Sequence, residues 1–183
     1  QLTGAFAPDL IFPMAETLLD LGTGTGVIAV TLLAERAGVR GMATDLEDGF
    51  LDRARRNAAR HGVADRLALC ASDWFTDVSG RFDLITSNPP YVSEADYREL
   101  APDILIGERR EALTPGGDGL AAYRVIARQA LAHLTSTGRL MVEIGHDQGQ
   151  AVAEIFSAIG LAEVEIHVDI NGTDRVVSGR NPA

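Results

Sequence analysis

Cysteine, histidine and long apolar runs are scarce in this chain of 183 residues, and each scarcity excludes a class of protein or site. The single cysteine, Cys70, excludes an internal disulfide and a cysteine-based zinc cluster. The four histidines are far apart and form no His-Glu-x-x-His pattern, so we expect no metal site. No run of about 18 apolar residues is present, so we expect no membrane-spanning helix. Residues 1–12 lack the basic start and apolar stretch of a signal peptide.

Positive charge is also in short supply. Lysine and arginine total 16 against 26 aspartates and glutamates, which gives a formal net charge of −10. Because nucleic-acid binding depends on neutralising phosphates with basic residues, this balance argues against a large nucleic-acid surface. It favours a protein partner or a small ligand. The lack of disulfides fits a reducing compartment, and we expect a cytoplasmic monomer.

Short apolar runs alternate along the chain with segments of helical period, which is typical of repeated β–α units around a mostly parallel sheet. The expected strands are residues 18–21, 41–45, 67–71, 82–87 and 139–144, followed by an antiparallel pair at 163–168 and 175–179 around Asn171-Gly172. The expected helices are residues 27–36, 50–61, 120–134 and 148–159. The predicted fold class is therefore α/β.

Between the first expected strand and helix lies the motif Asp20-Leu21-Gly22-Thr23-Gly24-Thr25-Gly26. Glycines there let the backbone turn tightly and approach a ligand closely. The dinucleotide fingerprint Gly-x-Gly-x-x-Gly would need a glycine at Val27, so the spacing argues against a dinucleotide. The acid at Asp20 points instead to a positively charged ligand. The candidate binding residues are Asp20, Gly22, Thr23, Gly24, Thr25 and Gly26, and the alternative is a simple glycine-rich turn.

Further candidates follow the second and third expected strands. Asp45 lies 19 residues after Gly26, where a carboxylate can accept hydrogen bonds from both ribose hydroxyls of a nucleoside, and Leu46 beside it joins the candidate site. Trp74 can stack on adenine, and Asp73 can accept a hydrogen bond from the exocyclic amine. The alternatives are a surface or capping role for Asp45 and core packing for Trp74.

The motif Asn88-Pro89-Pro90-Tyr91 follows the fourth expected strand and is the most specific in the chain. Open α/β sheets bind ligands at such carboxyl ends of strands. Asn88 offers an amide oxygen, Pro89 offers a carbonyl without an N–H, and the two prolines stiffen the backbone. This display of acceptors suits a planar –NH2 group with two protons to hold, and Tyr91 would supply a flat face. A rigid turn without function is the alternative.

The glycine motif and Asn88–Tyr91 together resemble the class I S-adenosylmethionine-dependent methyltransferases that modify planar –NH2 nitrogens. Within this class the chain closely resembles the HemK family, the release-factor glutamine methyltransferases. The resemblance runs from about residue 18 to the C-terminus and includes the stretches Phe82–Ser87, Glu108–Leu113, Gly117–Leu120, Glu143–Gly145 with Gln148, and Asp169–Gly179.

This resemblance implies a Rossmann-like, mostly parallel seven-stranded sheet with a C-terminal antiparallel pair, and S-adenosylmethionine as methyl donor. Gly22–Gly26 would wrap the methionine part of the cofactor, Asp45 would hold its ribose, and Trp74 would lie by its adenine. Asn88–Tyr91 would hold the substrate, which is the glutamine of the Gly-Gly-Gln motif in peptide-chain release factors, and Asn88 would also touch the cofactor. S-adenosylhomocysteine would be the second product.

Two features depart from the family pattern. The family has an N-terminal helical domain, of which we expect residues 1–17 to be a remnant, with residues 18–183 forming the catalytic domain. Arg109 stands where the family has the proline of a Glu-Pro pair, so we expect the loop after Asn88–Tyr91 to differ.

Three other functions stay open. Adenine and guanine methyltransferases of nucleic acids use similar loops, although the net charge of −10 argues against them. Ribosomal-protein glutamine methyltransferases share the Asn-Pro-Pro-Tyr motif, although the ending Asp174–Val177 favours the release-factor branch. An activator subunit with an inactive methyltransferase fold is the non-enzyme alternative.

Overall fold

The fold is that of a computed structural model, which describes residues 15–101 and 109–182. Most of the expected N-terminal remnant, residues 1–17, lies outside these ranges, and so does Glu108 of the stretch Glu108–Leu113. Within the described ranges, no helix is long and apolar enough to cross a membrane. No group of three metal-ligating side chains is assembled among the same residues.

Seven strands form a single sheet in the order β3-β2-β1-β4-β5-β7-β6, in which β7 runs antiparallel to its neighbours and the other neighbours are parallel. This confirms the predicted α/β fold with a mostly parallel sheet and a C-terminal antiparallel pair. The strands are β1 Thr17–Leu21, β2 Arg40–Asp45, β3 Leu67–Ala71, β4 Phe82–Ser87, β5 Leu134–Glu143, β6 Ala162–Val168 and β7 Asp174–Arg180.

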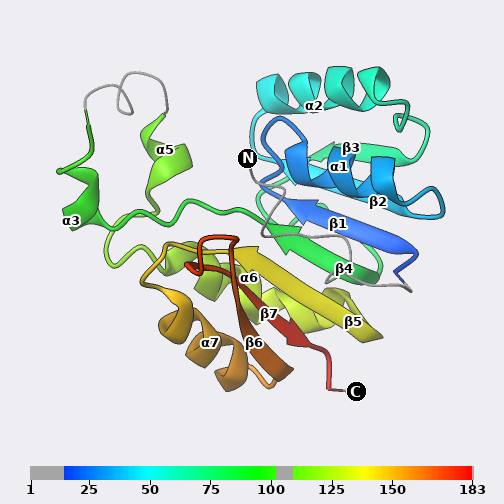
Figure 1. The fold of residues 1–183 in the computed structure, drawn as a ribbon. Helices are drawn as coiled ribbons and strands as arrows, with labels where there is room; N and C mark the ends of the chain where they lie inside the picture. Colours follow the sequence, from blue (N-terminus) through cyan, green and yellow to red (C-terminus); the bar gives the residue numbers. More distant parts are fainter. Residues whose placement is uncertain (1–14, 102–108, 183) are drawn as a thin grey trace.

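Helices cover both faces of the sheet (Figure 1). The helices are α1 Val27–Glu35, α2 Asp48–Arg60, α3 Glu94–Tyr97, α5 Arg110–Leu113, α6 Ala121–His133 and α7 Gly149–Ala158. Successive side chains of a strand point to opposite faces, so Leu18 packs with the core on the α1 side while Leu19 packs with the core on the α6 and α7 side. The central strands are therefore packed between two hydrophobic cores, which hold their carboxyl ends in place.

The order of the strands reverses between β1 and β4. These strands are parallel neighbours, and Leu21 at the end of β1 is paired with Ser87 at the end of β4. The hydroxyl of Ser87, which is fully buried, donates to the Leu21 carbonyl oxygen at 2.9 Å. A switch point of this kind opens a crevice at the carboxyl ends of the strands. The glycine motif and the Asn88 motif therefore leave the sheet side by side.

Several strands differ from their predicted bounds by one residue, and β5 differs by more. β5 begins at Leu134, directly after α6, whereas the prediction began at Arg139. Phe82 pairs with Leu134 but Leu84 pairs with Arg139, so β5 contains extra residues opposite β4. Such a bulge breaks the alternation on which the prediction rested. The stretch after Tyr91, where the sequence analysis named no helix or strand before residue 120, holds the short helices α3 and α5, which stand apart from the sheet in Figure 1.

Candidate active site

The loop after β1 depends on three glycines. Gly22, Gly24 and Gly26 have φ angles of 62°, 57° and 82°, which side chains other than that of glycine rarely adopt. A Cβ on Gly26 would also lie 3.0 Å from the Cβ of Ala54, so α2 packs directly against the loop. The loop ends in α1, and the first N–H groups of an α-helix have no partner within the helix.

Asp20 holds this loop in place through its carboxyl group. It is fully buried, its Oδ2 accepts a hydrogen bond from the Thr23 hydroxyl at 2.6 Å, and its Oδ1 accepts one from the Thr86 hydroxyl at 2.7 Å. Burial raises the pKa of Asp20 to about 6, although both hydrogen bonds oppose the shift. The carboxyl thus ties the glycine loop to β4 instead of facing solvent.

Asp45 closes the other side of the loop. Its Oδ2 accepts a hydrogen bond from the Gly24 N–H at 2.8 Å, and its Oδ1 accepts one from the Glu47 N–H at 3.1 Å. The side chain is only partly buried at the end of β2. The carboxylate therefore has hydrogen-bonding capacity left for a ligand.

Trp74 adopts an unusual backbone conformation after β3. Its φ is 51°, which is rare for a bulky residue and often marks a functional position. The Ser72 hydroxyl donates to the Trp74 carbonyl oxygen at 3.1 Å and accepts the Asp77 N–H at 3.0 Å, which holds the turn. A Cβ on Gly22 would lie 3.8 Å from Trp74 Cζ3, so the indole lies beside the glycine loop.

These segments surround a cleft of about 410 Å³, a volume typical of sites for small molecules and cofactors. Its lining includes four acids, Asp45, Glu47, Asp73 and Glu111, and no arginine or lysine among the residues that the structure describes. The remaining lining residues are Gly22, Thr23, Gly24, Thr25, Val27, Ile28, Leu46, Phe50, Ser72, Trp74, Asn88, Pro89, Pro90 and Ala112. This lining suits a ligand that carries positive charge, and it is unfavourable to a pyrophosphate.

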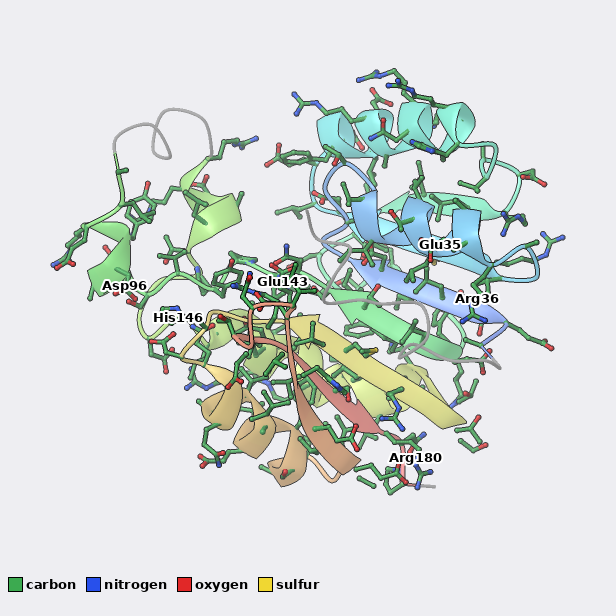
Figure 2. All side chains as sticks on the ribbon, viewed as in Figure 1. Glu35, Arg36, Asp96, Glu143, His146 and Arg180 are labelled. Atoms are coloured by element: carbon green, nitrogen blue, oxygen red, sulfur yellow. The ribbon has the colours of Figure 1, made fainter. Side chains whose placement is uncertain are left out.

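A second buried carboxyl lies beyond the Asn88 loop, at the end of β5. Glu143 is 5% exposed, and its Oε2 has no hydrogen-bond partner among the described residues. Burial raises the pKa of Glu143 to about 7, and the charge of Arg175 opposes the shift. Burial and the charge of Glu143 in turn raise the pKa of Tyr91. Figure 2 shows Glu143 near the middle of the molecule and His146 further out.

Residues 3–127, which are more than half of the chain, match the methyltransferase small domain family. The chain belongs to this family.

Several relatives of this methyltransferase domain cover nearly the whole chain. A release factor glutamine methyltransferase of Cereibacter sphaeroides is 57% identical over 183 residues, which are 100% of this chain and 66% of the relative. Proteins of the same name from Caulobacter vibrioides and Agrobacterium fabrum are 45% and 42% identical, covering 92% and 89% of this chain and 59% and 56% of their own lengths. The chain thus spans less than two thirds of these curated relatives.

Solved structures agree on the methyltransferase fold. A methyltransferase from Pyrococcus furiosus matches with a TM-score of 0.72 at 18% identity, covering 96% of this chain and 79% of that one. A ribosomal protein L11 methylase from Lactobacillus delbrueckii subsp. bulgaricus matches with a TM-score of 0.67 at 20% identity, covering 95% and 74%. At these identities the likeness concerns the fold alone.

Most of the predicted site residues lie together in the cleft of this methyltransferase domain. Those lining it are Gly22, Thr23, Gly24, Thr25, Asp45, Leu46, Asp73, Trp74, Asn88, Pro89 and Pro90. Three predicted residues are not among the lining: Asp20 is buried beneath the loop, Gly26 packs against α2, and Tyr91 lies toward Glu143. Their direct contact with a ligand stays a prediction.

The sequence analysis missed seven lining residues. They are Val27, Ile28, Glu47, Phe50, Ser72, Glu111 and Ala112. Glu47 was detectable as a second acid close to Asp45, but Glu111 and Ala112 come from α5, far along the chain. The side chain of Arg109, just before α5, pairs with Glu47 and so connects α5 to the rim of the cleft.

Proposed function

We propose that this chain is the catalytic domain of a release-factor glutamine methyltransferase, acting in the cytoplasm. It transfers a methyl group from S-adenosylmethionine to the side-chain amide nitrogen of the glutamine in the Gly-Gly-Gln motif. The observation that carries the proposal is the shared cleft. Asn88, Pro89 and Pro90 line the same cleft as the glycine loop, in a chain 57% identical to a protein named for this activity.

The residues of the cleft fit S-adenosylmethionine. The cofactor carries an ammonium and a sulfonium but no phosphate, and the cleft has four acidic and no basic lining residues within the described ranges. Asp45 would hold the ribose hydroxyls, and Trp74 would lie against the adenine, with Asp73 accepting from the exocyclic amine. Gly22–Gly26 would hold the methionine part, because a loop of this shape lets the backbone come close. When bound, the cofactor supplies an activated methyl group on a good leaving group.

The protein's task at the substrate is alignment. An amide nitrogen is a poor nucleophile because its lone pair is delocalised into the carbonyl. Asn88 Oδ1 and the Pro89 carbonyl would each accept one N–H of the glutamine amide, which turns the nitrogen toward the methyl group. Pro90 keeps the loop stiff, and Pro89 is buried, so the acceptors are held before the substrate arrives.

No covalent link to the protein is needed. The new bond would join the amide nitrogen to the methyl carbon, the donor's carbon–sulfur bond would break with its electrons staying on sulfur, and one amide proton would then leave to solvent. The products are N-methylglutamine and S-adenosylhomocysteine. A general base with a matched pKa is not required, because the nitrogen loses its proton readily once it is methylated.

The test is a competition for label. The chain is incubated with methyl-labelled S-adenosylmethionine, a purified release factor and a mixture of DNA and RNA, and the labelled polymer is identified. The proposal expects label on the release factor, lost when the glutamine of Gly-Gly-Gln is replaced by alanine. Label on the nucleic acid would overturn it and place the target base in a flipped position at Asn88.

A further inference from the structure

One side-chain amide holds the Asn88–Tyr91 loop from behind. Gln148, which immediately precedes α7, donates from Nε2 to the Tyr91 carbonyl oxygen at 2.8 Å. Its Oε1 accepts the Gly145 N–H at 3.0 Å. The hydroxyl of Tyr123 lies 3.2 Å from the same Oε1 and can donate to it. A single amide thus joins the loop after β4 to the turn after β5 and to α6.

The surroundings of this amide leave it little freedom. Tyr123 is fully buried, and its hydroxyl also lies 3.0 Å from the Glu143 carbonyl oxygen, to which it can donate instead. A Cβ on Gly119 would lie 2.4 Å from the Tyr91 carbonyl oxygen and 2.9 Å from Gln148 Nε2. The backbone at Gly119 therefore packs against the same contact. The Tyr91 carbonyl oxygen therefore lies between the Gln148 amide, which donates to it, and the closely packed backbone of Gly119.

The loop is consequently fixed at both ends. At one end, Ser87 and the ladder between β4 and β1 fix the start of the loop. At the other end, Gln148 fixes the carbonyl of Tyr91. The two prolines between these points restrict the remaining torsions. A shift at Tyr91 would therefore be transmitted to Asn88 and Pro89, which line the cleft.

We propose that Gln148 is a positioning residue for methyl transfer: by holding the Tyr91 carbonyl, it aims the acceptors of Asn88 and Pro89 at the substrate amide. This inference rests on the function proposed above. Gln148 does not line the cleft, and its hydrogen-bond partners Tyr91, Tyr123 and Gly145 lie outside the glycine loop. Its loss should therefore lower kcat and leave the affinity for S-adenosylmethionine unchanged.

The test uses the isosteric change Gln148→Glu. Glutamate keeps the acceptor for Gly145 and Tyr123 but loses the N–H that Tyr91 needs. We expect kcat at pH 8 to fall about 10- to 100-fold, as for a small misplacement of reacting groups. The dissociation constant for the cofactor, measured by calorimetry, should stay within about twofold of that of the unchanged chain. Gln150→Glu is the matched control, because Gln150 is exposed on α7 and its amide donates to the Glu154 carboxylate at 3.0 Å instead of to the loop.

A pH profile separates alignment from general damage. When the new glutamate is protonated, its O–H can donate to the Tyr91 carbonyl again, so the ratio of variant to unchanged kcat should rise as pH falls. Tyr91, Tyr123, Glu143, Asp174 and Arg175 face this part of the fold, and a new carboxylate would couple to Glu143. The same ratio is therefore also measured in a Glu143→Gln background, where it should still rise as pH falls. A flat ratio, an unchanged kcat, or a cofactor affinity that falls together with kcat would overturn the proposal.

Hydrogen exchange tests the inference without the substrate, so the result does not depend on the substrate's identity. Deuterium uptake at the amides of Asn88 and of residues 91–93 should be faster in Gln148→Glu and unchanged in Gln150→Glu. If the unchanged chain labels no release factor, the proposed function fails, but this exchange measurement still tests whether Gln148 holds the Asn88–Tyr91 loop. Equal uptake in all three proteins would show that Gln148 does not hold the loop.

Discussion

One buried carboxyl lies on each side of the cleft, and the two carboxyls differ in their hydrogen bonds. On the side of the glycine loop, where we propose the cofactor binds, Asp20 is fully buried and both of its oxygens accept short hydrogen bonds from Thr23 and Thr86. On the side of Asn88–Tyr91, where we propose the substrate binds, Glu143 is almost as deeply buried, but its Oε2 has no partner among the described residues. Burial raises the pKa of both acids, but the first is tied to the loop and to β4 by two hydroxyls, whereas the second has one oxygen without a hydrogen-bond donor among the described residues.

This difference suggests a division of labour between the two sides. The cofactor side holds its loop with backbone glycines, Asp20 and Asp45, so changes there should act on cofactor affinity. The substrate side displays Asn88 and Pro89 on a stiff loop that is supported from behind, so changes there should act on the rate of transfer. The predictions below test this division, starting with the largest effect.

Asn88→Ala should act on the rate. It removes the amide oxygen that would align the substrate nitrogen, and we expect kcat to fall about 100-fold or more. The affinity for S-adenosylmethionine should change far less, as measured by calorimetry. Normal turnover in a folded variant would remove Asn88 from the aligning role.

Asp45→Ala should act on the cofactor. It removes a carboxylate that lines the cleft and also holds the Gly24 N–H. We expect the dissociation constant for S-adenosylmethionine to rise about 10- to 100-fold, because hydrogen bonds to a charged group are worth about 1.5–3 kcal/mol. Asp45→Asn, which keeps one oxygen acceptor, is the milder comparison. Unchanged affinity in the alanine variant would exclude Asp45 from the ribose site.

Each of the two buried acids should lower the stability of the fold as pH rises through its own window. A raised folded-state pKa means that the contribution to stability is full below the ordinary pKa and is lost as pH rises through the raised value. The window is about 4.5 to 7 for Glu143 and about 3.8 to 6 for Asp20. Relative to the unchanged chain, Glu143→Gln should therefore become more stable with rising pH, by at most about 3 kcal/mol.

Chemical denaturation at a series of pH values measures this effect. Asp20→Asn is the matched variant, and its relative stability should rise within the lower window and level off above pH 6. Because Asp20→Asn also weakens the brace of the glycine loop, its baseline should lie below that of Glu143→Gln. Relative stabilities that stay constant with pH in both variants would contradict the raised pKa values of these two carboxyls.

Arg109→Ala should have the smallest effect. Arg109 pairs with Glu47 at the rim of the cleft, but its side chain is 62% exposed, and exposed pairs contribute only about 0.2–1 kcal/mol. We expect the dissociation constant for the cofactor to rise less than about fivefold, and this difference to vanish at high salt. Arg110→Ala is the control, since Arg110 pairs with Glu94 away from the cleft lining. Equal effects of both changes would contradict a role at the rim.

The sequence predicted the central sheet well because its strands are buried on both faces and end at distinct glycine, acidic or proline signals. It predicted the start of β5 poorly, because residues Leu134–Gly138 are polar and contain the register shift opposite β4. It also predicted most of the cleft lining, because Gly22, Asp45, Trp74 and Asn88 each lie at or just after the end of a strand in one mostly parallel sheet.

Other parts of the site needed the structure. The contact of Asp20 with a cationic ligand stays a prediction, but its hydrogen bonds to Thr23 and Thr86 needed the structure, because Thr86 lies 66 residues along the chain on the neighbouring strand β4. Glu111 reaches the cleft through the short helix α5, and although the stretch Glu108–Leu113 belongs to the family resemblance, that resemblance gave Glu111 no role. The contact between Gln148 and Tyr91 joins positions 57 residues apart, which no local pattern reports.

The most direct test of the account is to locate the transferred methyl group. A release factor is incubated with the chain and S-adenosylmethionine, digested and analysed by fragmentation mass spectrometry, with Asn88→Ala as the parallel reaction. The account predicts one added methyl on the side-chain amide of the Gly-Gly-Gln glutamine, strongly reduced in the parallel reaction. A methyl group on another residue, or equal modification by both proteins, would contradict it.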